Sequence, residues 1–151
     1  MPRSHAALVC RGVSVDAETN VLSLFDLLEE VQATINLPAD EALSSQGAVV
    51  VPLQYVVVAL IGRSDPDVAE NFVLRYQIQG PSTKALGEVH FNVDLTSHQR
   101  VRTIHRAAAI PIEKSGIHQF VFAYQTAGED TWNEIARYPM QIEVKVNTST
   151  P

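Results

Sequence analysis

The chain has 151 residues, of which 46% are hydrophobic and 19% are charged. This composition is ordinary for a globular protein and excludes global disorder. A chain of this length fits one domain that buries about 70% of its unfolded surface, so its core needs neither disulfides nor metal. Acidic residues outnumber basic ones, 17 to 11, and the formal net charge of −6 argues against nucleic-acid partners.

The cysteine and hydropathy patterns predict a cytoplasmic protein. Cys10 is the single cysteine and cannot form an internal disulfide, so the fold does not depend on an oxidising compartment. The longest apolar run, residues 55–61, is far shorter than the roughly 20 residues that a transmembrane helix needs. We therefore expect no membrane contact.

The first third of the chain contains one ambiguous segment. Residues 6–15 are predicted to form the first strand. Apolar residues in the segment 21–31 fall at helical spacing, and Ser23 with Asp26 would form a capping box. A strand is predicted there, with one short helix as the alternative. The polar stretch 38–46 is expected to be a mobile loop.

Apolar and polar residues alternate with period two in the segments 72–79, 88–95 and 140–146. This pattern predicts strands with one buried and one wet face, as in an antiparallel sheet. Residues 53–61 and 120–124 are apolar on both faces and rich in β-branched and aromatic residues, which predicts central strands.

Turn-forming residues separate these segments at regular intervals, which is typical of a sandwich rather than of βαβ units. Pro111 and Pro139 interrupt strand-like segments and are expected at an edge or a bulge. The polar tail 147–151 is expected to fray. The whole chain, 1–151, is thus predicted to be a single all-β domain, an immunoglobulin-like antiparallel β-sandwich of roughly seven to nine strands.

Several motifs resemble those of a family of small uncharacterised bacterial β-sandwich proteins. They are Val9-Cys10-x-x-Val13-x-Val15-Asp16, Leu22-Ser23-Leu24-Phe25-Asp26, Gly116-Ile117-His118-Gln119-Phe120-Val121-Phe122, Trp132 and Arg137-Tyr138-Pro139-Met140. The resemblance covers nearly the whole chain. It implies a β-sandwich, favours a strand for the segment 21–31, and transfers no catalytic residues.

The histidines do not show the close spacing of zinc ligands. Strand pairing could still bring His90, His105 and His118 together, although His90 lies on the polar face of its strand and is expected to point to solvent. Cys10 lies in an apolar run that would raise its thiol pKa and make it inert. The scattered glycines form no phosphate-binding loop, so no cofactor is expected.

Carboxylates cluster at Asp65, Asp67 and Glu70, and a loop of this kind at the end of a sandwich is a candidate calcium site. The alternative is a plain turn, because Asp caps main-chain N–H groups and Pro66 fixes φ.

Positive charge is concentrated in residues 98–106, where the candidate anion- or partner-binding residues are Arg100, Arg102 and Arg106. Arg100 and Arg102 are two positions apart, so on a strand they share a face. Adjacent guanidinium groups repel unless an anion is near. That anion could be a carboxylate of a neighbouring strand, such as Glu88 or Asp94, or it could belong to a ligand.

Trp132 and Tyr138 flank the last predicted turn. Aromatic residues at the end of a sandwich can stack on sugars or on a partner's side chains, but burial trends favour core anchors for both.

The sequence favours a non-enzymatic binding module, because each candidate catalytic group has a plausible structural role. Its partner would be a protein, either another protein or a second copy, bound through a sheet edge or the arginine-rich strand. The closing strand, residues 140–146, is the expected edge for a homodimer. The alternative is a metal-dependent or carbohydrate-active enzyme with its site in the sandwich-end loops.

Overall fold

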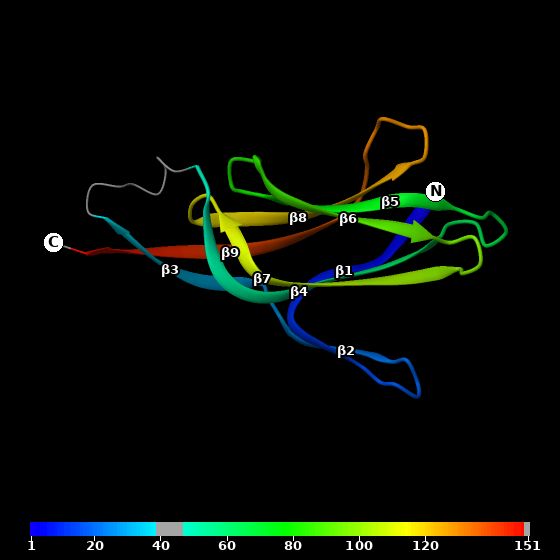
Figure 1. Cartoon of the computed structure of the whole chain (residues 1–151), viewed down its shortest axis with the longest axis horizontal. Coiled ribbons are helices and arrows are strands. Elements are labelled where there is room, and N and C mark those ends of the chain that lie inside the picture. The colour runs from blue at the N-terminus through cyan, green and yellow to red at the C-terminus, as the bar shows by residue number, and fades with distance from the viewer. Residues whose placement is uncertain (39–46, 150–151) are drawn as a thin grey trace.

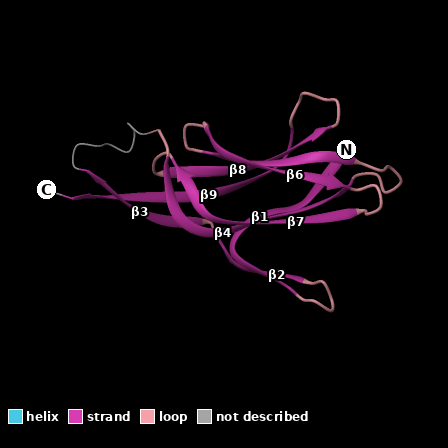
Figure 2. Ribbon diagram, viewed as in Figure 1, coloured by secondary structure: helices cyan, strands magenta, loops and turns pink. Residues whose placement is uncertain are grey.

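The computed structural model describes residues 1–38 and 47–149, which form two β-sheets packed face to face and contain no helix, membrane-spanning or otherwise (Figures 1 and 2). The four-stranded sheet has the order β2 (Leu22–Leu27), β1 (Pro2–Val15), β4 (Val49–Arg63), β7 (Arg100–Ile112). The five-stranded sheet has the order β3 (Glu30–Pro38), β9 (Asn133–Ser149), β8 (Gly116–Thr126), β5 (Asn71–Gln79), β6 (Ala85–Asp94). The predicted β-sandwich is confirmed.

The connections are those of an immunoglobulin-like sandwich. The hairpins β5–β6 and β8–β9 lie in one sheet, while β4 and β7 lie in the other, so the chain crosses between sheets three times after β4. The segment 21–31 contributes to β2 and β3, and the helical alternative is therefore wrong. Its apolar spacing arises because Leu22 and Leu24 pack on one face of a hairpin while Leu28 enters the main core.

One strand pair departs from the expected antiparallel pattern. β3 runs parallel to β9, from Glu30 beside Gln141 to Pro38 beside Ser149. The sequence predicts that residues 140–146 form an open edge for a homodimer. This prediction is wrong from Gln141 onward, because β3 pairs with β9 there. β9 continues to Ser149 and so includes residues 147–149 of the tail that is predicted to fray. Residues 39–46 of the expected loop, and residues 150–151, lie outside the described residues.

The main core lies between the sheets and is rich in aromatic residues. Tyr76 of β5 lies near its centre, with its ring centroid 6.1 Å from those of Phe120 and Phe122 on β8. Tyr55 of β4 packs edge-on against Phe120 across the two sheets, at 5.8 Å. Burying each such side chain stabilises the fold by about 1.5–3 kcal/mol, so these contacts are a main reason why the two sheets stay together.

A second, smaller core lies on the outer side of the four-stranded sheet. Cys10, Val56 and Val58 are buried there. They are covered by side chains of the β1–β2 hairpin and of β7, namely Val13, Leu22, Leu24 and Ile104. The hairpin projects from the body of the sandwich in Figure 1. This cover explains why residues 53–61 are apolar on both faces, and the predicted central position of that strand is confirmed.

The prolines occupy the positions that were expected. Pro111 lies on β7, the outer strand of its sheet. Pro139 pairs with Gln119 of β8, and β3 joins the other side of β9 only from Gln141 onward. Pro139 therefore lies where β9 is still an edge, so its missing N–H leaves no ladder bond unmade.

Candidate functional site

A polar and aromatic surface covers the outer side of the five-stranded sheet. Strand alternation turns Leu74, Tyr76 and Ile78 inward, so the residues between them point outward. The surface, called here the Arg75 face, comprises Arg75, Gln77 and Gln79 of β5, Glu88 and His90 of β6, and Trp132 of the β8–β9 loop.

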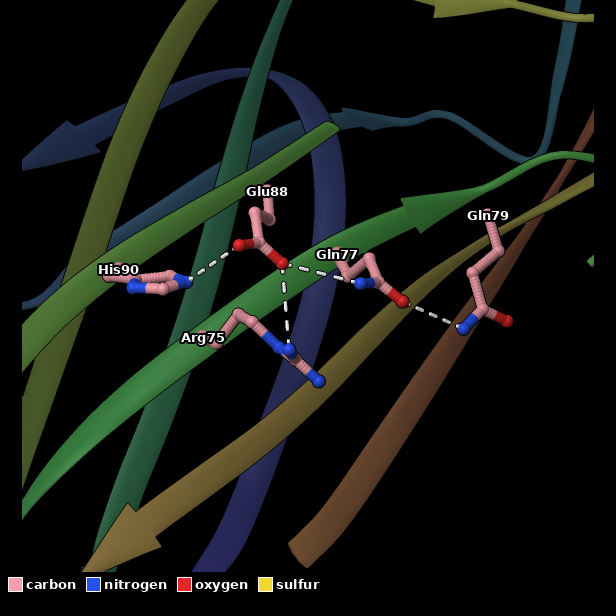
Figure 3. Close-up of polar contacts among 5 residues, drawn as sticks. All are labelled: Arg75, Gln77, Gln79, Glu88 and His90. Carbon is pink, nitrogen blue, oxygen red and sulfur yellow. Dashed lines mark hydrogen bonds and ion pairs between the residues drawn. The ribbon is translucent and has the colours of Figure 1, made fainter. Parts of the chain in front are cut away.

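Glu88 is the hub of the hydrogen-bond network on this face (Figure 3). Its Oε2 accepts from Arg75 Nη1 at 3.5 Å and from Gln77 Nε2 at 3.3 Å. Its Oε1 lies 3.3 Å from His90 Nε2. Gln79 extends the network by donating from Nε2 to Gln77 Oε1 at 2.9 Å. The network therefore links five outward side chains of two neighbouring strands.

Trp132 packs against this network from the side of the β8–β9 loop. The Arg75 guanidinium carbon lies 4.1 Å from the centroid of the Trp132 ring, within the range of a cation–π interaction. The His90 ring lies 5.3 Å from the same indole. Arg75 is only 17% exposed, and its Nε is buried without a hydrogen-bond partner among the described residues. A buried donor without a partner is uncommon and costs stability.

The sequence predicts the solvent-exposed faces of β5 and β6, but not that these faces form one surface with Trp132. His90 is exposed, as predicted. Tyr138 belongs to the main core, which confirms its prediction as an anchor. The same prediction for Trp132 is wrong, because its ring packs on Arg75 and His90 outside the core. The joint surface depends on the register that sets Arg75 beside His90, which alternation alone does not reveal.

The arginine-rich strand is β7, and its arginines share the outer face of the four-stranded sheet, as predicted. Arg102 donates to the main-chain oxygen of Asn20 at 3.3 Å and to Asn20 Oδ1 at 2.8 Å. Asn20 lies in the β1–β2 turn with a φ of 56°, a conformation that Asn tolerates. Arg102 therefore fastens the hairpin tip to β7.

The expected pairing of these arginines with Glu88 or Asp94 is wrong. Glu88 contacts Arg75 on the other sheet, and Asp94 accepts from the main chain and hydroxyl of Thr96. Within the described ranges, Arg100 and Arg106 form no ion pair with a carboxylate. Their proposed role toward an anion or a partner stays a prediction.

The three carboxylates of the predicted calcium loop have separate surroundings. Asp65 Oδ1 accepts from the main-chain N–H of Asp67 at 3.0 Å, which is the turn-capping role considered as the alternative. Glu70 forms an ion pair with the amino group of Met1. Residues 1–38 and 47–149 contain no group of three or more histidine, cysteine, aspartate or glutamate side chains that could hold a metal ion.

The histidines are dispersed through the sandwich. His90 lies on the Arg75 face, whereas His105 Nδ1 lies 2.5 Å from the Tyr76 hydroxyl between the sheets. His118 is fully buried on β8, where its Nδ1–H donates to the main-chain oxygen of Gly116 at 3.2 Å. Cys10 is buried, and burial raises the pKa of its thiol, as expected from its apolar surroundings.

A cavity of about 660 Å³ opens at one end of the sandwich. Its lining includes the carboxylates of Glu70, Glu129 and Asp130, together with Tyr124 and Asn133. Glu70 Oε2 is buried and has no hydrogen-bond partner among the residues that the structure describes. Met1 also lines the cavity, and its amino group pairs with Glu70. Three carboxylates against one ammonium group leave the cavity acidic, which favours a cationic or hydroxyl-rich ligand.

Comparison with known proteins does not assign a family. No family model and no curated protein matches the chain. Among solved structures, a β-glucuronidase from glycoside hydrolase family 2 matches with 17% identity over 74% of this chain, with a TM-score of 0.43. The chain spans 12% of that enzyme. A Bordetella pertussis protein described as ApaA matches with 15% identity over 70% of this chain and 85% of its own, with a TM-score of 0.36. Neither likeness bears on function.

The contact between Arg102 and Asn20 leads to a prediction about the hairpin. Arg102→Ala removes two exposed hydrogen bonds, which together contribute about 1 kcal/mol. We expect β2 amides to exchange hydrogen about fivefold faster, with little effect on core strands. Arg100→Ala, on the same face of β7, is the matched control. Equal exchange in the two variants would contradict this role of Arg102.

The buried His118 predicts a loss of stability in acid. Burial lowers the pKa of His118 below its ordinary value, so the unfolded chain binds a proton that the folded chain excludes. The free energy of unfolding should therefore fall as the pH drops below about 6.5, by up to about 1.4 kcal/mol per pH unit.

Denaturant unfolding at pH 7.5 and pH 5.5 measures this contribution. His118→Leu lacks the titrating group and should lose less stability between these pH values than the wild type does. The other titrating groups are common to both proteins and cancel in the comparison. An identical loss in the two proteins would rule out His118 as the source.

Proposed function

We propose that this protein is a non-enzymatic binding module that recognises another protein through the Arg75 face. The observation that carries the proposal is the Arg75–Trp132 pair, a guanidinium held 4.1 Å from an indole centroid on the outer side of a sheet. Tryptophan and arginine are the residue types most enriched among those that dominate binding energy at protein interfaces.

The fixed geometry of this pair supports the proposal. Glu88 and Trp132 hold the Arg75 guanidinium from two sides, so little side-chain freedom remains to be lost on binding. Gln77 and Gln79 extend the surface with further polar groups along β5, which suits the polar rim of an interface.

Selection from a displayed random-peptide library tests this proposal, with the purified protein as bait. Peptides enriched on the wild type should bind Trp132→Ala and Arg75→Ala at least tenfold more weakly, as measured by calorimetry. That loss corresponds to about 1.4 kcal/mol, which is typical of a central interface residue.

Arg100→Ala is the control for this experiment, because Arg100 lies on the other sheet. It should leave the affinity unchanged. Circular dichroism and thermal unfolding check that each variant keeps the fold. Enriched peptides that bind both Arg75-face variants as tightly as the wild type would refute the proposal.

The acidic end cavity favours a second candidate function, a carbohydrate-active enzyme. Three carboxylates line a cavity of about 660 Å³, and glycoside hydrolysis commonly uses paired carboxylates. This function predicts hydrolysis of chromogenic glycosides that Glu70→Gln abolishes. Asp65→Asn, outside the cavity lining, should retain the activity. Absence of turnover, or equal turnover by the wild type and Glu70→Gln, would exclude this candidate.

A further inference from the structure

A groove of about 420 Å³ lies on the four-stranded sheet, on the opposite side of the sandwich from the Arg75 face. Arg11 and Gly12 of β1, Gln54 and Tyr55 of β4, and Arg106 of β7 contribute to its lining. The groove therefore joins one arginine of the predicted anion-binding strand to an arginine that sequence reasoning did not single out.

The groove exists because two strand ladders stop beside it. The β1–β4 ladder ends at Cys10, beyond which β1 pairs with β2 instead. The β4–β7 ladder is irregular between Pro52 and Tyr55. Gln54 consequently has no ladder partner on either neighbouring strand. The strands separate at this irregularity, which leaves room for the groove.

The groove is positively charged, in contrast to the protein as a whole. Arg11 and Arg106 are both exposed, and no hydrogen bond or ion pair joins either side chain to a residue within 1–38 or 47–149. The lining contains no carboxylate, although the protein as a whole carries a formal net charge of −6. Two uncompensated guanidinium groups around one groove repel each other, and a bound anion would relieve that repulsion.

We propose that this groove binds a phosphate group, held between Arg11 and Arg106. A guanidinium group presents paired N–H donors that match two oxygens of one anion. Phosphate carries more oxygens and a larger negative charge than a carboxylate, so it can form paired hydrogen bonds with both arginines at once. The arrangement therefore favours phosphate over carboxylate. The phosphate can come from the free ion or from a phosphorylated side chain of a partner.

Nuclear magnetic resonance tests the proposal by following the arginine side-chain Nε–H signals during titration with inorganic phosphate at constant ionic strength. Saturable shifts are expected for Arg11 and Arg106 in the wild-type protein. Arg11→Ala and Arg106→Ala should each weaken phosphate binding at least tenfold. Arg100→Ala, which removes an exposed arginine of the same strand outside the groove, should leave the affinity within twofold.

Two further titrations identify the source and the selectivity. A phosphoserine peptide that binds more tightly than inorganic phosphate would assign the site to a modified protein, and equal binding would assign it to the free ion. Acetate should bind at least tenfold more weakly. The proposal is overturned if acetate binds as well as phosphate, if phosphate does not saturate, or if Arg100→Ala weakens binding as much as the groove variants do.

Discussion

The central constraint on this structure is that β4 is apolar on both faces. Val57, Ala59 and Ile61 face the main core, while Val56 and Val58 face outward. If the outer face of the four-stranded sheet were open to water, Val56 and Val58 would be exposed. The β1–β2 hairpin covers it, and Arg102 fastens the tip of the hairpin.

Because the hairpin covers only the four-stranded sheet, the outer faces of the two sheets differ. To form the hairpin, β1 must leave β4 after Cys10, and the space that it vacates is the groove between Arg11 and Arg106. The outer face of the five-stranded sheet has no such cover and presents an ordered polar surface instead. The two proposed binding sites thus lie on opposite sides of one core, so a ligand on one need not exclude a ligand on the other.

Much of the fold can be predicted from the sequence, because the alternation of apolar and polar residues can be seen within a single strand. The segments 72–79 and 88–95 match β5 and β6 closely, and the apolar segment 53–61 indicated a central strand. The parallel pairing of β3 with β9 was not accessible, because no local pattern distinguishes parallel from antiparallel neighbours at an exposed edge.

The candidate sites were harder to predict than the strands, since they depend on register. Strand spacing predicts that Arg102 shares a face with Arg100. It does not predict the hydrogen-bond partner of Arg102, Asn20, because no local pattern shows that the β1–β2 hairpin folds back toward β7. Trp132 was assigned to the core because large aromatic residues are usually buried. Its observed position requires the loop after β8 to reach Arg75 on a neighbouring strand. Arg11 was passed over as an ordinary member of the first strand, because nothing local marks where β1 leaves β4.

The parallel pairing of β3 with β9 also has a consequence for how the chain folds during synthesis. Gln32 and Lys145, which are hydrogen-bonded across this pair, are 113 positions apart. The early strand β3 therefore has no partner in its sheet until β9 has been synthesised. Until then its apolar residues, Val31, Ala33 and Ile35, remain without their final cover. A truncated chain that lacks β9 would leave β3 without a strand partner and one edge of β8 unpaired, and unpaired strand edges favour aggregation.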